Sequence, residues 1–233
     1  MSYNIILFDV DDTLFDFKTT EEKALHKTFS QFELATGLAD YGAAYKEISK
    51  GLWEDLEEGR ITLAELGVER FRRLFQTTQL DVRAEDFSSA YLENLGKEVH
   101  LVPGAVELCN SLEGCRLGII TNGFASVQTS RIAASPLCDS FEHLIISEEV
   151  GYKKPDQEIF EYAFSKLQLT DKSNVLMVGD SLTSDIQGGV NYGVDTCWFN
   201  PLGKENQTNI QPTYEIRELR ELQEIVRMGN VNL

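Results

Sequence analysis

Residues 5–14 read Ile-Ile-Leu-Phe-Asp-Val-Asp-Asp-Thr-Leu, and the architecture can be worked out from this stretch. The apolar run Ile5–Phe8 is short and has no polar alternation, which is typical of a strand buried on both faces of a parallel sheet. It ends at an acidic cluster, Asp9, Asp11 and Asp12. Parallel sheets bind ligands at the carboxyl ends of their strands. The stretch therefore predicts an α/β fold whose first strand brings carboxylates to a ligand site.

Strand and helix patterns alternate after Pro103–Gly104. Apolar runs predict further strands at Leu117–Ile120, Leu144–Ile146, Val175–Val178, Thr196–Phe199 and the start of Tyr214–Val226. Helical patterns follow them at Ser126–Ala134, in a segment that Pro155 opens, in a Gly-rich segment after Asp180 and at the end of Tyr214–Val226. Repeated strand–helix units predict a mainly parallel, Rossmann-like sheet with helices on both faces.

The segment Phe17–Glu98 has no strand pattern. Its apolar and aromatic residues recur at helical spacing in four stripes, around Phe29, Tyr45, Phe71 and Tyr91. Such stripes indicate the core of a four-helix module. We therefore expect an α/β core formed by residues 1–16 and 99–233, interrupted by an all-α four-helix insertion at residues 17–98.

Composition narrows the class of protein. The 233 residues include 38 acidic and 21 basic side chains, a net charge of −17, which argues against a surface for nucleic acid polymers or anionic membranes. Ile5–Phe8 is too short for a membrane span or a signal peptide. The four cysteines have no CxxC spacing and the three histidines are isolated, so we expect reduced thiols, no zinc site and a cytoplasmic protein.

Polar residues follow four of the predicted strands. They are Asp9, Asp11, Asp12 and Thr13 after the first; Thr121, Asn122 and Gly123 after the second; Lys153, Lys154 and Pro155 in the loop after the third; and Asp180, Ser181 and Asp185 after the fourth. Clustered carboxylates repel one another unless a cation lies among them. Mg²⁺ suits such oxygen ligands and often binds substrate phosphate as well. The set predicts a Mg²⁺ site that handles a phosphorylated small molecule.

Each residue type has a chemical role in this interpretation. Asp9 would attack phosphorus and form an aspartyl phosphate, and Asp11 would protonate the leaving alcohol and then activate water. Lys154 would bridge nucleophile and phosphate, while Thr121, Asn122 and Gly123 would bind phosphate oxygens beside a helix N-terminus. The predicted metal ligands are Asp9, Asp11, Asp180 and Asp185, the last either directly or through water.

Four sequence motifs follow one another along the chain: Asp9-Val10-Asp11-Asp12-Thr13-Leu14, Thr121-Asn122-Gly123, Lys154-Pro155, and Gly179-Asp180-Ser181 with Asp185. In this order they resemble the motifs of the haloacid dehalogenase (HAD) superfamily of aspartate-nucleophile phosphatases. The resemblance covers essentially the whole chain and implies that the insertion is a C1-type cap that closes over the sheet. The strings ITNGF, SEEVGYKKPDQEIFEYA and VGDSLTSDIQGG are most similar to the pyrimidine 5′-nucleotidase branch. That likeness implies a nucleoside monophosphate as the small-molecule partner of a monomer or small homo-oligomer.

Other functions stay open at this stage. A phosphoglycolate or sugar-phosphate phosphatase, or a phosphomutase, of the same superfamily would share these motifs. Receiver domains of signalling proteins also combine a phosphorylatable Asp with acidic residues, Thr, Lys and Mg²⁺, although they are about half this length and have no cap. A dehalogenase is disfavoured, because dehalogenases of this superfamily typically lack the acid–base carboxylate at the position of Asp11.

Some neighbouring residues have simpler interpretations. Asp12 suits a turn or helix cap better than a third catalytic carboxylate. Lys153 is expected at the surface. The segment Phe15–Phe17 either lines the site or forms the hinge into the cap.

Overall fold

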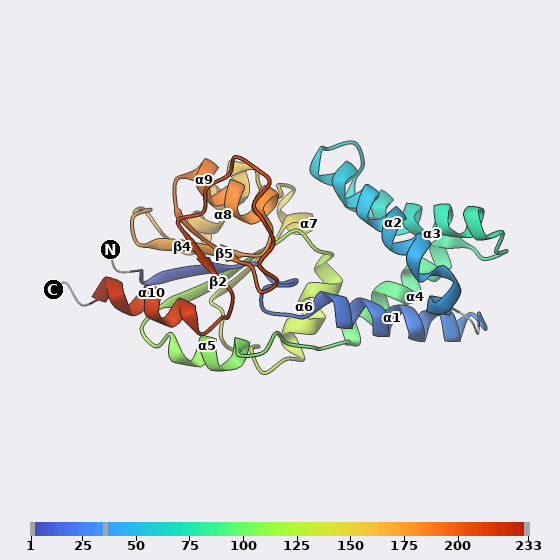
Figure 1. Cartoon of the computed structure of the whole chain (residues 1–233), viewed down its shortest axis with the longest axis horizontal. Coiled ribbons are helices and arrows are strands. Elements are labelled where there is room, and N and C mark those ends of the chain that lie inside the picture. The colour runs from blue at the N-terminus through green and yellow to red at the C-terminus, as the bar shows by residue number, and fades with distance from the viewer. Residues whose placement is uncertain (1–2, 35–36, 231–233) are drawn as a thin grey trace.

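The computed structural model describes residues 3–34 and 37–230 of the chain, and one parallel sheet organises it (Figure 1). The sheet has six strands in the order β3-β2-β1-β4-β5-β6, and every neighbouring pair is parallel. The strands are β1 Ile5–Phe8, β2 Arg116–Thr121, β3 His143–Ile146, β4 Val175–Gly179, β5 Asp195–Phe199 and β6 Tyr214–Ile216. The predicted α/β class and parallel sheet are confirmed.

The strand order places β1 at the centre of the sheet. The chain moves outward on one side through β2 and β3, and then crosses to the other side of β1 to form β4. Helices on the two sides diverge where the order reverses, which leaves a crevice outside the carboxyl ends of the strands. The crevice therefore lies beyond the ends of β1 and β4, which pair directly with each other.

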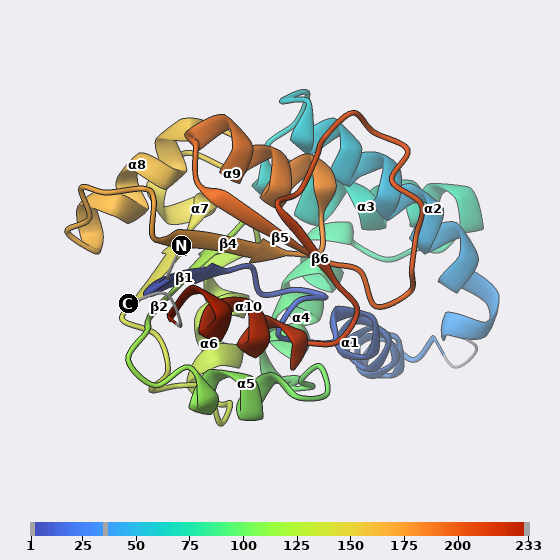
Figure 2. The same cartoon turned by 60° about the vertical axis from the view of Figure 1, so that its left-hand side comes forward.

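Successive side chains of β1 point to opposite faces of the sheet and join different hydrophobic clusters. Ile6 and Phe8 pack in a cluster with side chains of α5 (Ala105–Ser111), α6 (Ala125–Ala133) and α10 (Glu221–Asn230). Ile5 and Leu7 pack in a second cluster with α8 (Gln157–Lys166) and with Tyr192 of α9 (Gln187–Tyr192). Both faces of the sheet are thus covered, as Figure 2 shows, and this explains the uninterrupted apolar run of β1.

Four helices form the segment between β1 and α5. They are α1 (Phe17–Gln31), α2 (Gly37–Glu57), α3 (Leu63–Thr78) and α4 (Ala84–Lys97), and they lie to one side of the sheet (Figure 1). Their buried side chains form a third cluster, in which Phe124 and Val127 also take part. The helical character of this segment is as predicted, whereas its boundaries as a separate domain stay a prediction.

The structure differs from the sequence-based expectation between β3 and α9. Pro155 does not open a helix: it lies in a turn closed by Asp156 N–H donating to the Lys153 carbonyl at 2.8 Å, and α8 begins at Gln157. The short helix α7 (Ser147–Val150) precedes this turn, and a π-helical turn, η1 (Leu182–Ile186), precedes α9. In the described residues, no helix combines the length and apolarity that crossing a membrane requires.

Candidate active site

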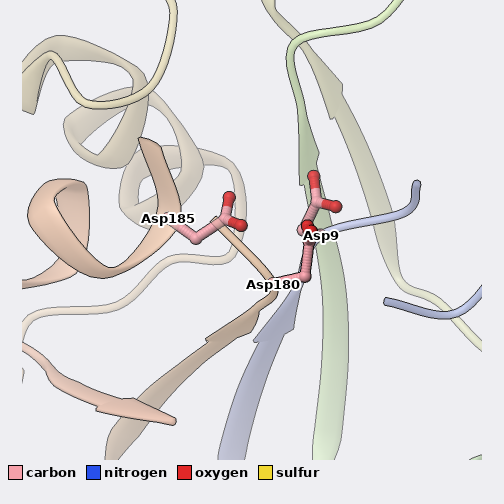
Figure 3. Close-up of side chains that lie close together, drawn as sticks. All are labelled: Asp9, Asp180 and Asp185. Carbon is pink, nitrogen blue, oxygen red and sulfur yellow. The ribbon is translucent and has the colours of Figure 1, made fainter. Parts of the chain in front are cut away.

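Three carboxylates meet at the crevice between the ends of β1 and β4. Asp9 follows β1, Asp180 follows β4, and Asp185 lies in the π-helical turn η1 (Figure 3). One oxygen from each of the three lies within 4.8 Å of the others. The structure thus brings together three of the four residues predicted to bind metal.

Local structure at the end of β4 allows Asp185 to come this close. Its Oδ2 accepts a hydrogen bond from the backbone N–H of Ser181 at 3.0 Å, which folds the η1 turn back onto the strand end. A Cβ atom on Gly179 would lie 2.2 Å from the same oxygen, well inside van der Waals contact. Glycine at position 179 is therefore required for this position of Asp185.

Lys154 lies against the carboxylate cluster and is almost fully buried. Its Nζ lies 2.5 Å from Asp9 Oδ1 and 2.7 Å from Asp185 Oδ1, and it also donates to the Ile120 carbonyl at 2.6 Å. Burial disfavours the ammonium charge, but the two carboxylates outweigh that effect and raise the pKa of Lys154. Lys154 is thus a fixed positive charge beside Asp9.

One ammonium group does not balance three carboxylates. Burial raises the pKa of Asp9 to about 7, against the opposing effect of Lys154. Burial also raises the pKa of Asp180, and repulsion from Asp185 and Asp9 adds to this rise. A divalent cation with a preference for oxygen ligands would relieve that repulsion. The donor set of Asp9, Asp180 and Asp185 therefore fits such an ion.

Asn122 lies in the site but uses its side chain to hold the backbone of Lys154. Its Oδ1 accepts from Lys154 N–H and its Nδ2 donates to the Lys154 carbonyl, both at 2.9 Å. The paired bonds attach the loop after β3 to the end of β2. The structure places this amide on the loop that carries the lysine, and phosphate binding by Asn122 stays a prediction.

Thr121 and Gly123 lie at the end of β2, directly before α6. Thr121 Oγ1 accepts hydrogen bonds from Gly123 N–H and from Gln128 Nε2, each at 3.3 Å. A Cβ atom on Gly123 would lie 2.3 Å from Gln128 Nε2, so the turn is packed tightly on the first turns of α6. Both residues line the same cavity as Asp9 and Asp11.

The Asp11 side chain lies outside the carboxylate cluster. Its Oδ1 lies 2.5 Å from Arg131 Nη1, and its Oδ2 accepts from Gln128 Nε2 at 2.7 Å. The guanidinium of Arg131 is fully buried and stacks over the Phe15 ring, 4.8 Å from its centroid. Asp11 is thus oriented by α6, whereas the three clustered carboxylates are oriented by the strand ends and by η1.

Residues beside these carboxylates have structural roles. Asp12 has a left-handed backbone (φ 59°), and its Oδ1 accepts from Phe17 N–H at 3.1 Å, so it is the turn residue that the sequence indicates. Asp16 caps α1 by accepting from Thr19 N–H.

Phe17 lines the cavity beside Asp9. Lys153 is half-buried, and its Nζ donates to the Leu56 carbonyl at the end of α2.

Sequence reasoning did not identify Gln128, Arg131 or the cavity residues supplied by the helices. Gln128 and Arg131 are separated by three positions on α6, so they share a face, and this face follows the Thr121–Gly123 turn directly. That spacing is a signal that could have found them. Trp53 and Arg70 carried no such signal, because α2 and α3 contain many residues at helical spacing.

The sequence was compared with those of known protein families, and the match covers all the site residues described above. Residues 3–193 match the sequence pattern of the haloacid dehalogenase-like hydrolases. The chain belongs to the haloacid dehalogenase-like hydrolase family. The resemblance predicted from its four motifs is thereby confirmed, and so is the predicted enzyme class, a phosphatase of this family.

Individual relatives in the family match almost end to end. The pyrimidine 5′-nucleotidase YjjG of Escherichia coli is 37% identical, covering 97% of this chain and 99% of that protein. The pyrimidine 5′-nucleotidase PynA of Streptococcus pneumoniae is 38% identical, covering 95% and 94%. The magnesium-bound crystal structure of the HAD-hydrolase YfnB from Bacillus subtilis superposes with a TM-score of 0.91 at 38% identity, covering 97% of this chain and 99% of that one.

Proposed function

We propose that this HAD hydrolase is a Mg²⁺-dependent phosphomonoesterase that hydrolyses nucleoside 5′-monophosphates, pyrimidine nucleotides above all, through an aspartyl phosphate at Asp9. The observation that carries the proposal is the contact between buried Asp9 and buried Lys154 inside a cluster of three carboxylates. The similarity to YjjG and PynA supports the choice of substrate.

The carboxylates Asp9, Asp180 and Asp185 would hold the Mg²⁺ ion. When bound, Mg²⁺ neutralises the cluster and stabilises negative charge on the phosphoryl oxygens. The magnesium-bound structure of YfnB supports this assignment by analogy. The side chain of Asp11 is assigned to acid–base chemistry alone, because Arg131 and Gln128 turn it away from the cluster.

The reaction has two steps in this proposal. A carboxylate oxygen of Asp9 attacks phosphorus, the bond from phosphorus to the ester oxygen breaks, and Asp11 gives its proton to that oxygen as the alcohol leaves. Water then attacks the phosphorus of the aspartyl phosphate, Asp11 takes the proton back, and inorganic phosphate and free Asp9 are formed. Lys154 holds Asp9 in place and offsets charge throughout.

The test is phosphate release from a panel of monophosphates with Mg²⁺, namely dUMP, dTMP, UMP, AMP, phosphoglycolate and several sugar phosphates. We expect the pyrimidine nucleotides to be hydrolysed with the highest kcat/KM, and Asp9→Asn to lower kcat by about 10³-fold or more because the nucleophile is lost. Asp139 is exposed, so Asp139→Asn is the matched control and should behave as wild type.

Other outcomes would redirect the proposal. Hydrolysis confined to sugar phosphates or phosphoglycolate would retain the mechanism and reject the nucleotide assignment. Near-wild-type activity in Asp9→Asn, or full activity in the presence of EDTA, would reject the mechanism. A stable phosphoprotein without turnover would favour the signalling alternative.

A further inference from the structure

The cavity beside Asp9 and Asp11 extends from the strand ends into the four-helix segment. Its volume is about 280 Å³. The end near the sheet is polar, whereas the remaining walls are almost entirely apolar and aromatic, formed by Phe17, Trp53, Leu95, Phe124 and Val127. The charged exception among these walls is Arg70 of α3. A cavity of this character suits a phosphate at one end and a flat, weakly polar group at the other.

Arg70 is only 1% exposed and has poor hydrogen-bond partners. Its Nε reaches the Gly67 carbonyl at 3.4 Å and its Nη1 reaches the Tyr45 hydroxyl at 3.5 Å, both at the long limit of a hydrogen bond. Its Nη2 has no hydrogen-bond partner among the residues that the structure describes. A guanidinium has five N–H donors, and leaving them unpaired in a buried position is costly.

Aromatic rings surround Arg70 without satisfying those donors. The guanidinium carbon lies 4.6 Å from the centroid of the Tyr91 ring, 5.1 Å from that of Phe71 and 5.6 Å from that of Phe124. Such cation–π contacts favour a buried cation. They offer no lone pair to an N–H group in the guanidinium plane, however, so an acceptor is still needed.

Phe124 connects Arg70 to the phosphate end of the cavity. It comes directly after Gly123, and its ring packs against α3, where a Cβ atom on Gly67 would lie 3.2 Å from it. Gly67 and Arg70 are separated by three positions and therefore lie on the same face of α3. The guanidinium thus stands next to the residue that follows the Thr121–Gly123 turn, at a position that a leaving group attached to the phosphate can approach.

We propose that Arg70 recognises the leaving group by donating hydrogen bonds to a carbonyl oxygen on a planar ring bound between the aromatic walls. The proposal rests on the proposed nucleotidase function and names a residue that would select the base. Uracil and thymine carry such in-plane oxygens. The hydroxyl groups of a sugar phosphate would face apolar walls instead, and would lose hydrogen bonds to water without replacement.

The experiment compares dUMP with 2-deoxyribose 5-phosphate, which has the same sugar and phosphate without the base. Wild type is expected to prefer dUMP. In Arg70→Met, kcat/KM for dUMP should fall by about 10- to 100-fold, the loss of hydrogen bonds from a charged donor, while the value for 2-deoxyribose 5-phosphate stays within about 3-fold. Arg73→Met, an exposed arginine on the same helix, is the matched control.

A purely structural Arg70 would give a different result. The melting temperature would fall, and kcat/KM would fall by the same factor for both substrates. An unchanged ratio of kcat/KM for dUMP to that for 2-deoxyribose 5-phosphate would therefore overturn the proposal. Should Arg70→Met not fold, Arg70→Lys retains the charge but loses the planar set of donors, and it should still lower the preference for dUMP several-fold. Wild type that hydrolyses no nucleotide would instead reject the proposed function, and this assignment with it.

Discussion

Asp11 and Arg131 form a pair whose geometry bears directly on acid–base chemistry. Arg131 is fully buried, and Asp11 is the carboxylate it contacts. Within residues 3–34 and 37–230, no group accepts a hydrogen bond from its Nε or Nη2. Replacing Arg131 by methionine removes the buried charge and leaves Asp11, whose side chain is 28% exposed and is therefore still hydrated when its partner is lost. The effect on activity is therefore expected to exceed the effect on stability.

Arg131→Met tests this role. We expect kcat for nucleotides to fall by about 10- to 100-fold, because their alkoxide leaving groups need a well-placed acid. The fall should be smaller for p-nitrophenyl phosphate, whose leaving group needs little protonation. Arg116→Met, which removes a surface contact with Glu142, is the control. Equal losses on the two substrates would mean that Arg131 does not position the acid.

Asp180 offers a test of the metal site that does not depend on turnover. Mg²⁺ that binds only the folded protein should raise the free energy of unfolding by about 2.7 kcal/mol at an Mg²⁺ concentration 100 times its Kd. The melting temperature should rise accordingly. In Asp180→Asn this shift should be largely lost, since a ligand is missing. Without Mg²⁺, the variant should melt higher than wild type, because one of three mutually repelling carboxylates is neutral. Thermal scans with and without Mg²⁺ measure both effects, and an undiminished Mg²⁺ shift in the variant would place the ion elsewhere.

The end of β4 and the η1 turn act together as one structural unit. Close packing of Gly179 against Asp185 allows the turn to return its carboxylate to the strand end. Small-to-large changes at such contacts typically cost about 1–3 kcal/mol. The position of the Asp185 carboxylate therefore depends on the absence of a side chain at residue 179.

Gly179→Ala should destabilise the protein by that amount and also weaken the Mg²⁺-dependent rise in melting temperature. Gly51→Ala is a matched control within α2, because a Cβ atom there would have no atom of the described part of the chain within 4 Å. Alanine favours a helix interior over glycine, so this control should gain about 0.5–1 kcal/mol. Chemical denaturation of both variants measures these changes, and a neutral Gly179→Ala would contradict the packing argument.

The end of α2 joins the four-helix segment to the sheet across the site. Lys153 donates to the Leu56 carbonyl, one of the last carbonyl groups of α2, and Thr183 Oγ1 donates to Glu57 Oε2 at 3.3 Å. Trp53, one turn earlier on α2, lines two cavities that Asp9 also lines. These contacts hold the end of α2, and with it Trp53, against the loops that carry Lys154 and Asp185.

Lys153→Met should loosen this junction. We expect KM for nucleotides to rise by about 3- to 10-fold, the loss of one partly exposed hydrogen bond, with little change in the melting temperature. Lys172→Met is the matched control, because the exposed Lys172 also donates to a carbonyl at a helix end, that of Tyr192 in α9, but both residues lie outside the four-helix segment. That control should lower stability and leave KM unchanged. The opposite pattern would show that Lys153 has no role at the site.

Local patterns were sufficient for the strands and for the chemical class. The observed strands begin and end within one residue of the predicted runs at β1, β2 and β4, because an apolar run bounded by polar residues has few other ways to be buried. The error at Pro155 arose because a proline suits both a first helical turn and a preceding loop. Because parallel strands present their carboxyl ends at one edge, the order of the motifs also placed Asp9, Thr121, Lys154 and Asp180 in a single site.

Side-chain pairing depended on the tertiary structure. Asp11 follows β1 as Asp9 does, yet it turns to Arg131, 120 positions away, whereas Asp9 joins Asp180 and Asp185. In the sequence Arg70 belongs to a helical stripe, whereas in the structure it lines the cavity beside Asp9 and Asp11. Periodicity reports which face of an element is buried, but it carries no information about the partner that the face meets. The order of the strands and the packing of the helices determine that partner. The sequence could therefore specify the class of reaction, whereas only the fold could show that Asp11 pairs with α6 and that Arg70 lines the cavity.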